Sequence, residues 1–389
     1  MKKEIKSPLL PVRMLDLYRQ RKYLDGRVEA MIEEVLTHSH FVGGKQIEDF
    51  EAWLKEYTGF SFAVGVSSGT DALIMALMAD GIGQGDAVFL PSFTYVATAE
   101  IVLLLGAQPI FVDVDSQNYQ MSVEDLEEKI KVVKKENRFI PKAILAVDLF
   151  GQPAPWSELS KISCKYDLKL YDDSAQSFGA QYKGQASGKL ARATTLSFFP
   201  AKPLGAYGDG GAILTDDFHL AEKYRSIRSH GCGKDAYDIV DVGLNARLDT
   251  LQAAILLAKT HSFEEECVKR RKNVSFYNEF LPDIFIRPSC LENGKGVWSV
   301  YTILLPEKIN REECRHFLSE AGIENAVYYT KPLHRQKAYE KFHNGLALPV
   351  SEWLCDRVLS LPIHAYLSLE ELEKVVEVLT QFAEKQALS

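Results

Sequence analysis

The first half of the chain alternates short apolar, β-branched runs with longer stretches whose apolar residues recur at helical spacing. Runs of the first kind predict strands, and stretches of the second kind predict helices. The predicted strands cover 62–67, 86–91, 109–114, 143–151 and 168–173, and the predicted helices cover 69–81, 97–106 and 122–136. This alternation predicts an α/β domain whose mostly parallel sheet is covered on both faces. Ligands of such sheets bind at the carboxyl ends of the strands.

The pattern changes after about residue 250. A helical stretch with few breakers covers 248–281, followed by a predicted strand at 300–306 and predicted helices at 310–322 and 368–386. We therefore expect a large domain over residues 1–250, with an N-terminal helical segment at 15–38 that packs on a neighbouring element. Residues 251–389 are expected to form the long connecting helix and a smaller α+β domain.

Composition and charge narrow the function. The 389 residues are 46% apolar and 25% charged, which is ordinary for a globular protein. A net charge of −8 without any basic run argues against a nucleic-acid partner. The six cysteines are far apart and lack a histidine cluster, so we expect free thiols in a reducing compartment and no metal site. No apolar run is long enough to span a membrane and no leader is apparent, which favours a cytoplasmic protein.

One lysine, Lys202, stands between an apolar run and a glycine-rich run in TTLSFFPAKPLGAYGDGGAILT, residues 194–215. Pro200 and Pro203 flank it and favour extended or turn conformations. We therefore expect Lys202 on a stiff, non-helical and largely buried segment. A buried amine either finds a partner or loses its proton, and a neutral amine is a nucleophile toward carbonyl groups.

Two other stretches carry candidate binding groups at strand ends. Ser68, Gly69 and Thr70 stand between a predicted strand and a predicted helix, where they either cap the helix or bind a phosphate at its N-terminus. Tyr95 follows the next strand, and it is either a core residue or an aromatic face for a planar ring.

Two further stretches are equally ambiguous when each is taken alone. Asp172 and Asp173 end a predicted strand, so a carboxylate either lies over the ligand crevice or caps the following element, on which Gln176 stands. Asn245 and Arg247 precede the long helix, where either residue could cap it or face solvent.

Together these residues match the needs of pyridoxal 5′-phosphate. This cofactor requires an amine for its aldehyde, a carboxylate for its ring nitrogen, an aromatic face and phosphate donors. The matching residues are Lys202 for the aldehyde, Asp173 for the ring nitrogen, Tyr95 for the ring face, and Gly69, Thr70 and Ser197 for the phosphate.

The same motifs resemble a known family. The order SSGTDAL, PSFTYVATAE, YDDSAQSFGA, SFFPAKPLGAYGDGGA, NARLDTLQAAIL, KPLHRQKAY and SLPIHAYL is similar to the DegT–StrS nucleotide-sugar aminotransferases, from about residue 15 to about residue 379. The resemblance implies a fold-type I enzyme, with a mostly parallel seven-stranded sheet in its large domain and a smaller C-terminal α+β domain. It also implies that Lys202 is the catalytic lysine and that Asp173 pairs with the pyridine nitrogen. Ser174 replaces the family's usual alanine.

The resemblance also implies partners. It implies L-glutamate as amino donor, a nucleotide-linked keto-sugar as acceptor, and a homodimer in which Asn245 reaches the phosphate of the neighbouring subunit's cofactor. Gln176 is expected to contact the ring hydroxyl of the cofactor. Tyr328, Tyr329 and His334 are expected in the sugar pocket, although Tyr328 stands where the most similar relatives carry a histidine.

The acceptor is expected to be aminated at C3 of a UDP-linked 2-acetamido-3-oxo-hexose or -hexuronate, giving an amino-sugar for cell-surface polysaccharide such as the O-antigen of lipopolysaccharide. Because Asn245 and Arg247 are two residues apart, extended backbone places both side chains on one face. Arg247 could then clamp a sugar carboxylate, or it could face water or the diphosphate. The alternatives are a dTDP-linked 3-oxo-6-deoxyhexose or a 4-oxo-sugar.

Three other readings compete. Some relatives dehydrate or deoxygenate sugars and carry histidine in place of the lysine, but Lys202 is present. A non-catalytic regulatory protein that binds the cofactor is disfavoured because Lys202, Asp173 and Gln176 occur together. A nucleotide loop at GAYGDGGA is disfavoured because it lacks the required order of glycines.

Overall fold

A seven-stranded sheet forms the centre of the molecule in the computed structural model, which describes residues 11–235, 237–343, 345 and 347–387. Its strands lie in the order β1-β9-β8-β5-β4-β2-β3. Six of them run in the same direction, and β9 is antiparallel to both of its neighbours. The expected mostly parallel sheet is therefore confirmed. The bounds are β1 (Phe62–Val66), β2 (Asp86–Pro91), β3 (Gln108–Val112), β4 (Ile140–Val147), β5 (Lys169–Asp173), β8 (Ala193–Ser197) and β9 (Gly211–Thr215).

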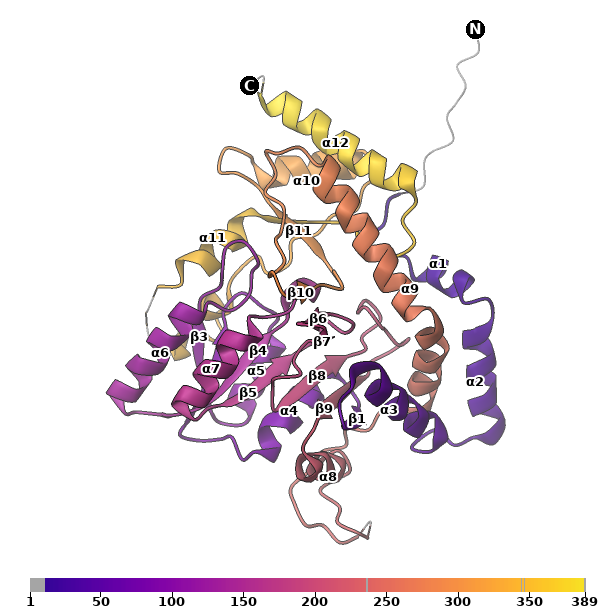
Figure 1. The fold of residues 1–389 in the computed structure, drawn as a ribbon, viewed down its shortest axis with the longest axis vertical. Coiled ribbons are helices and arrows are strands. Elements are labelled where there is room, and N and C mark those ends of the chain that lie inside the picture. The colour runs from indigo at the N-terminus through magenta and orange to yellow at the C-terminus, as the bar shows by residue number, and fades with distance from the viewer. Residues whose placement is uncertain (1–10, 236, 344, 346, 388–389) are drawn as a thin grey trace.

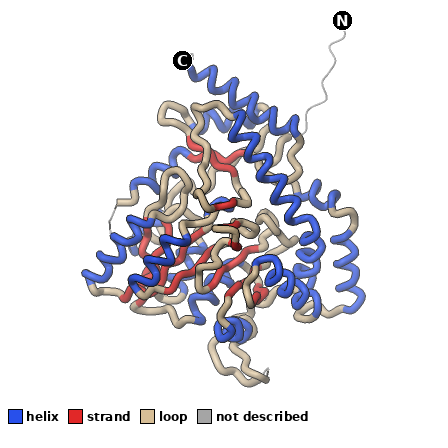
Figure 2. Tube along the Cα trace, viewed as in Figure 1, coloured by secondary structure: helices blue, strands red, loops and turns tan. Residues whose placement is uncertain are grey.

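Helices cover both faces of this sheet, as the alternating pattern predicts. In β2, Val88 and Leu90 join one core with the helix residue Leu73, whereas Phe89 joins the opposite core with Leu126. This alternation follows from the two-residue repeat of a strand. Figure 2 shows the helices flanking the strands. The helices that follow the strands are α4 (Gly69–Ala79), α5 (Ala97–Leu104), α6 (Val123–Glu136), α7 (Trp156–Tyr166) and α8 (Phe218–Ile227).

The N-terminal helical segment is two helices rather than one. α1 (Leu17–Tyr23) and α2 (Arg27–His38) are separated by a turn in which Asp25 has a φ of 46° and Gly26 a φ of 76°. Backbone in this left-handed region ends a helix. Leu24 and Val28 pack against α9, so this segment has the packing partner that the sequence predicts. α3 (Lys45–Thr58) follows.

The helix α9 (Thr250–Phe280) links two hydrophobic cores. Leu256 and Phe263 in its first half join the core beside β8 and β9, and Tyr277 in its second half joins a separate core with Val12. Figure 1 shows α9 running from α2 and α3 toward α12. The second core surrounds a two-stranded sheet, β11 (Tyr301–Leu304) and β12 (Val358–Leu361), with α10 (Arg311–Glu320) and α12 (Leu369–Ala387).

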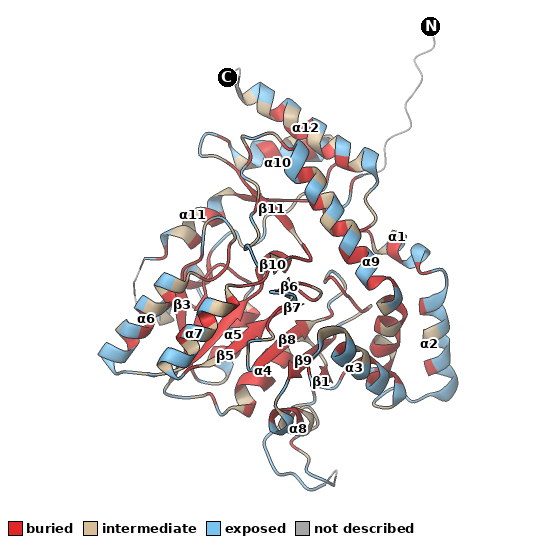
Figure 3. Cartoon of the chain, in the orientation of Figure 1, coloured by how far each residue is buried: buried red, intermediate tan, exposed pale blue. Residues whose placement is uncertain are grey.

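The remaining elements are short. They are a small sheet of β6 (Gln181–Tyr182), β7 (Gln185–Ala186) and β10 (Gly294–Lys295), the helix α11 (Pro349–Arg357), and the 3₁₀ turns Leu149–Gly151, Leu333–Arg335 and Glu340–Phe342. Figure 3 shows the central strands as buried and the outer helices as mixed buried and exposed. None of the helices described is both long and apolar enough to cross a bilayer. No disulfide bond joins any of the six cysteines, all of which lie in the described part of the chain.

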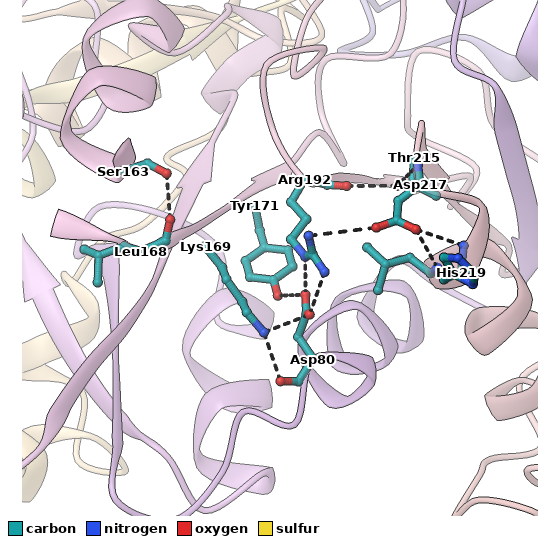
Figure 4. Close-up of polar contacts among 10 residues, drawn as sticks. Asp80, Ser163, Leu168, Lys169, Tyr171, Arg192, Thr215, Asp217 and His219 are labelled. Carbon is teal, nitrogen blue, oxygen red and sulfur yellow. Dashed lines mark hydrogen bonds and ion pairs between the residues drawn. The ribbon is translucent and has the colours of Figure 1, made fainter. Parts of the chain in front are cut away.

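An ion cluster fastens the amino ends of the central strands (Figure 4). Asp80, directly after α4, accepts hydrogen bonds from Lys169 at 2.8 Å, from Arg192 at 2.8 Å and from the hydroxyl of Tyr171. Burial acts to raise the pKa of Asp80, but these hydrogen bonds outweigh it and leave the pKa below its usual value. The cluster ties α4 to β5 and β8 at the edge opposite their carboxyl ends.

Candidate active site

A cavity of about 400 Å³ lies where β1, β5 and β8 end. This is the edge at which ligands of parallel sheets bind. Most of the predicted site residues line it, although they come from distant parts of the chain. The predicted residues that line the cavity are Gly69, Thr70, Tyr95, Asp173, Gln176, Ser197, Lys202, Tyr328 and Tyr329.

Lys202 lies on a non-helical turn after β8, as the flanking prolines predict. Its backbone N–H donates to the carbonyl of Phe199 at 2.8 Å, which closes the turn. Within the described part of the chain, its amine forms no ion pair, and the residue lines the cavity. Burial lowers the pKa of Lys202, and the charge of Asp173 opposes this shift in part. The amine is therefore more readily neutral than a surface lysine.

Asp173 is the last residue of β5 and lines the cavity. Its carboxylate accepts hydrogen bonds from the Thr98 hydroxyl at 2.8 Å and from the Ala175 N–H at 3.2 Å. Burial raises the pKa of Asp173, against these hydrogen bonds and the charge of Lys202. Asp172 points away from the cavity, because successive residues of a strand face opposite sides.

Asp172 belongs to a second, buried acidic pair. Burial and the nearby carboxylate of Asp148 raise the pKa of Asp172, and burial raises the pKa of Asp148 to about 6. Ser174 donates to Asp172 at 2.8 Å, and Ser177 donates to Asp148 at 3.0 Å. The serine that departs from the family pattern therefore helps to satisfy this pair.

The N-terminus of α4 lines the cavity, where the sequence allowed either a helix cap or a phosphate site. Ser68 caps the helix by accepting from the Asp71 N–H at 3.0 Å. The N–H groups of Gly69 and Thr70, in the first turn, have no intrahelical acceptor and can bind an anion. A Cβ on Gly69 would lie 2.7 Å from the Cβ of Ser197, so only glycine allows the helix to approach β8 this closely.

Aromatic side chains form another wall of the cavity. Tyr95 is 58% exposed, so it is not the core residue that one reading allowed. Tyr329 has a φ of 62°, and its hydroxyl accepts a hydrogen bond from Gln176 Nε2 at 2.8 Å. The Oε1 atom of Gln176 accepts from the Phe150 N–H at 3.0 Å, which fixes the amide's orientation. One amide hydrogen of Gln176 remains available to a ligand.

Three predicted residues do not line this chain's cavity. Asn245 and Arg247 are exposed on one face, as expected for extended backbone, with Arg247 Nη2 donating to Asn245 Oδ1 at 2.8 Å. His334 is buried, and its ring nitrogens lie 2.7 Å from Ser92 Oγ and 2.9 Å from a Glu352 carboxylate oxygen. Because both nitrogens are engaged, His334 holds the turn at 333–335 rather than presenting a polar group to the cavity.

Sequence reasoning missed several polar residues of the site. Thr98, which supports Asp173, carries no distinguishing signal within the apolar, largely buried helix α5. Thr94, Ser299 and Arg270 line the cavity with buried polar atoms that have no hydrogen-bond partner. Arg270 is hidden in the run KRRK of the long helix, where an arginine is normally a surface residue.

Comparison with known proteins identifies the family. The model of the DegT/DnrJ/EryC1/StrS aminotransferase family matches residues 22–380. The chain belongs to this family. The predicted resemblance is therefore confirmed, and so is the prediction of an aminotransferase that depends on pyridoxal phosphate, as this family does.

Three similar proteins illustrate how far the likeness extends. The chain is 40% identical to the UDP-2-acetamido-2-deoxy-3-oxo-D-glucuronate aminotransferase of Pseudomonas aeruginosa, over 95% of this chain and 99% of the relative. It is 37% identical to a pleiotropic regulatory protein of Geobacillus stearothermophilus, over 95% and 98%. A solved DegT DnrJ EryC1 StrS aminotransferase from Brucella abortus superposes with a TM-score of 0.93 at 43% identity, covering 95% of this chain and 99% of that one.

The residues of this aminotransferase fit the cofactor that the family uses. A neutralisable amine, a buried carboxylate and a free helix N-terminus line one cavity. The unpartnered hydroxyl of Thr94 offers a further hydrogen-bonding group. This donor set matches an aldehyde, a ring nitrogen and a phosphate on one planar molecule.

Proposed function

We propose that this aminotransferase moves an amino group from L-glutamate to C3 of a UDP-linked 2-acetamido-3-oxo sugar. The observation that carries the proposal is the juxtaposition of Lys202 and Asp173 in one cavity, with the free N-terminus of α4 beside them. The similarity to an aminotransferase of a UDP-linked 3-oxo-glucuronate supports this choice of acceptor. The product would supply an amino-sugar to a cell-surface polysaccharide such as the lipopolysaccharide O-antigen.

The residues of the chain divide the work as follows. Bound pyridoxal phosphate supplies the electron sink that lets the donor's α-carbon lose a proton. The amine of Lys202 takes that proton as a general base and returns it as a general acid. Asp173 holds a proton at the ring nitrogen, and the hydroxyl of Thr98 holds the carboxylate in place. Gly69, Thr70 and Ser197 would bind the phosphate, and Tyr95 would cover the ring face.

Binding of the sugar is proposed to involve two chains. Asn245 and Arg247 are exposed and do not line their own cavity, which supports a role for them at the cavity of a second subunit. Asn245 would reach the phosphate of the neighbouring cofactor, and Arg247 would clamp a sugar carboxylate. Tyr328 and Tyr329 would contact the sugar from within the same chain. This arrangement requires a homodimer, and we propose that it acts in the cytoplasm.

Incubation with pyridoxal phosphate tests the cofactor chemistry. Wild-type protein should turn yellow, and borohydride should fix the cofactor on Lys202. Lys202→Ala should fold but show no turnover, whereas Lys55→Ala, which removes an exposed lysine of α3, should remain active. A colourless wild-type protein, or activity in Lys202→Ala, would contradict the proposal. Yellow protein that aminates no sugar would instead favour a regulatory role, as the relative from Geobacillus stearothermophilus is described.

A substrate panel and subunit mixing test the remaining parts. UDP- and dTDP-linked 3-oxo and 4-oxo sugars, each assayed with glutamate, would separate the proposed acceptor from the dTDP-linked alternative. Mixed Lys202→Ala and Asn245→Asp chains should regain activity in hybrid dimers, because one hybrid site then has an intact Lys202 and an intact Asn245. An active monomer would exclude shared sites.

A further inference from the structure

Arg270 on α9 is a buried cation that forms no ion pair within the described residues. Its side chain lines the cavity, and the residue is only 4% exposed. Its Nε and Nη1 atoms have no hydrogen-bond partner, and within the described residues it forms no ion pair. An arginine cannot lose its proton at any pH that a protein tolerates. A buried unpaired charge is costly, so the position is favourable only when an anion joins it.

Among the described residues, no carboxylate lies within 4.0 Å of a guanidinium nitrogen of Arg270. Glu266, one helical turn earlier, accepts hydrogen bonds from Gln20 at 3.0 Å, Ser262 at 3.0 Å and Tyr366 at 2.8 Å. Its carboxylate is therefore held by three neutral donors. Burial, followed by the charge of Arg270, lowers the pKa of His364 to about 4, so this histidine is neutral near pH 7.

The cavity identifies the class of anion. Among its described lining residues the cationic side chains are Lys202 and Arg270, and only Arg270 stays charged when the lysine is neutral. An amino-acid donor brings carboxylates into this cavity, whereas the proposed function assigns the sugar carboxylate to Arg247 of a second subunit. Ser299, whose hydroxyl also has no partner, lines the same cavity and could share a carboxylate.

We propose that Arg270 binds a carboxylate of the amino donor. This inference rests on the proposed transamination and names the residue that recognises its first substrate. The guanidinium supplies charge-assisted hydrogen bonds to the carboxylate. Donor binding in turn neutralises the buried charge. Because the unpaired charge destabilises the empty protein, relief of this destabilisation adds to the affinity for the donor.

Glutarate, which has two carboxylates but no amine, separates binding from turnover. Calorimetry with the holoenzyme should show glutarate binding that weakens about ten- to a hundredfold in Arg270→Gln, the loss expected for hydrogen bonds to a charged group. Arg271→Gln is the matched control, because Arg271 on the same helix forms an ion pair with the exposed Glu264 and does not line the cavity. Arg270→Lys, which keeps the charge without the planar fork, should lose less.

The two half-reactions identify the substrate that Arg270 serves. Arg270→Gln should require about ten- to a hundredfold more glutamate for half-maximal loss of the yellow colour. Reaction of the aminated enzyme with keto-sugar should be unchanged. Unchanged glutarate and glutamate binding would overturn the inference, as would a defect confined to the keto-sugar step, which would assign the guanidinium to the sugar or its diphosphate.

Stability of the apoprotein excludes a structural role. Arg270→Met removes an unpaired buried charge, so its midpoint of urea unfolding should equal or exceed that of wild type. A clearly lower midpoint would show that Arg270 supports the fold and would overturn the inference. Glutarate binding that depends on Arg270 in an enzyme that aminates no keto-sugar would overturn the proposed function while leaving this assignment intact.

Discussion

Gly69→Ala should separate two roles of the α4 N-terminus, helix packing and phosphate binding. The added Cβ would lie 2.7 Å from the Cβ and 3.2 Å from the Oγ of Ser197. Carbon atoms in contact are usually separated by about 3.5–4.0 Å, so α4 must move away from β8 by roughly 1 Å. Overpacking of this size costs about 1–3 kcal/mol of folding stability.

The same movement displaces the N–H groups proposed to bind the cofactor phosphate. Loss of one hydrogen bond to an anion is worth about 1.5–3 kcal/mol, which corresponds to about a ten- to a hundredfold weaker affinity for pyridoxal phosphate. Urea unfolding of the apoprotein would measure the first effect, and titration of the yellow colour would measure the second. Gly83→Ala is the control, because its added Cβ would meet only one atom, at an ordinary 3.4 Å.

A double-mutant cycle tests the cause. Ser197→Gly removes the Cβ that the new alanine meets, so Gly69→Ala should cost less stability in this background than in wild type. Additive costs in the apoprotein would refute the steric argument. Wild-type cofactor affinity in Gly69→Ala would refute the assignment of the phosphate site to this helix.

Three further predictions concern charged groups. Asp173→Asn should still bind cofactor but lose about 10²–10⁴-fold in turnover, and Thr98→Val should lose less; near-wild-type rates in both would refute the role of Asp173 at the ring nitrogen. Asp80→Asn should cost about 2–3 kcal/mol, a value reduced because Lys169 and Arg192 are partly exposed. Folding lowers the pKa of Asp80. The contribution of Asp80 to the free energy of unfolding is therefore full above about pH 4 and is lost as the pH falls through the folded-state pKa. The higher urea midpoint of wild type relative to Asp80→Asn should accordingly vanish in acid. Arg247→Ala should cost about 2–4 kcal/mol in kcat/KM for a 3-oxo-glucuronate and far less for the uncharged 3-oxo-glucose, and equal losses would assign Arg247 elsewhere.

The repeating patterns in the sequence predicted most of the sheet, because the hydrophobic period of a strand or helix is visible within a few neighbouring residues. The carboxyl-end location of Asp173 followed from the same pattern. The reversed direction of β9 did not, since the residues of an internal strand are similar whichever way it runs. The break at Asp25 and Gly26 was also missed, because the apolar periodicity continues across it.

A site residue was predictable where its residue type is uncommon in its sequence context, such as a charged side chain within a predicted buried segment. Lys202 between two prolines is such a case. Thr98 and Arg270 were not predictable, because their importance depends on which buried groups lie across the cavity from a distant part of the chain. His334 shows the converse, since a histidine in a family motif is held by Ser92 and Glu352.

The continuous helix α9 has a consequence for how the molecule unfolds. One end of it contributes to the core beside the sheet and the other end to the core around β11 and β12, with no loop between them. Near the first end, the buried amine of Lys259 donates to the carbonyl of Gly205 at 2.6 Å, in the turn that carries Lys202. Unfolding of either core therefore removes packing from a helix that also stabilises the other core. The two parts should consequently unfold in a single cooperative transition.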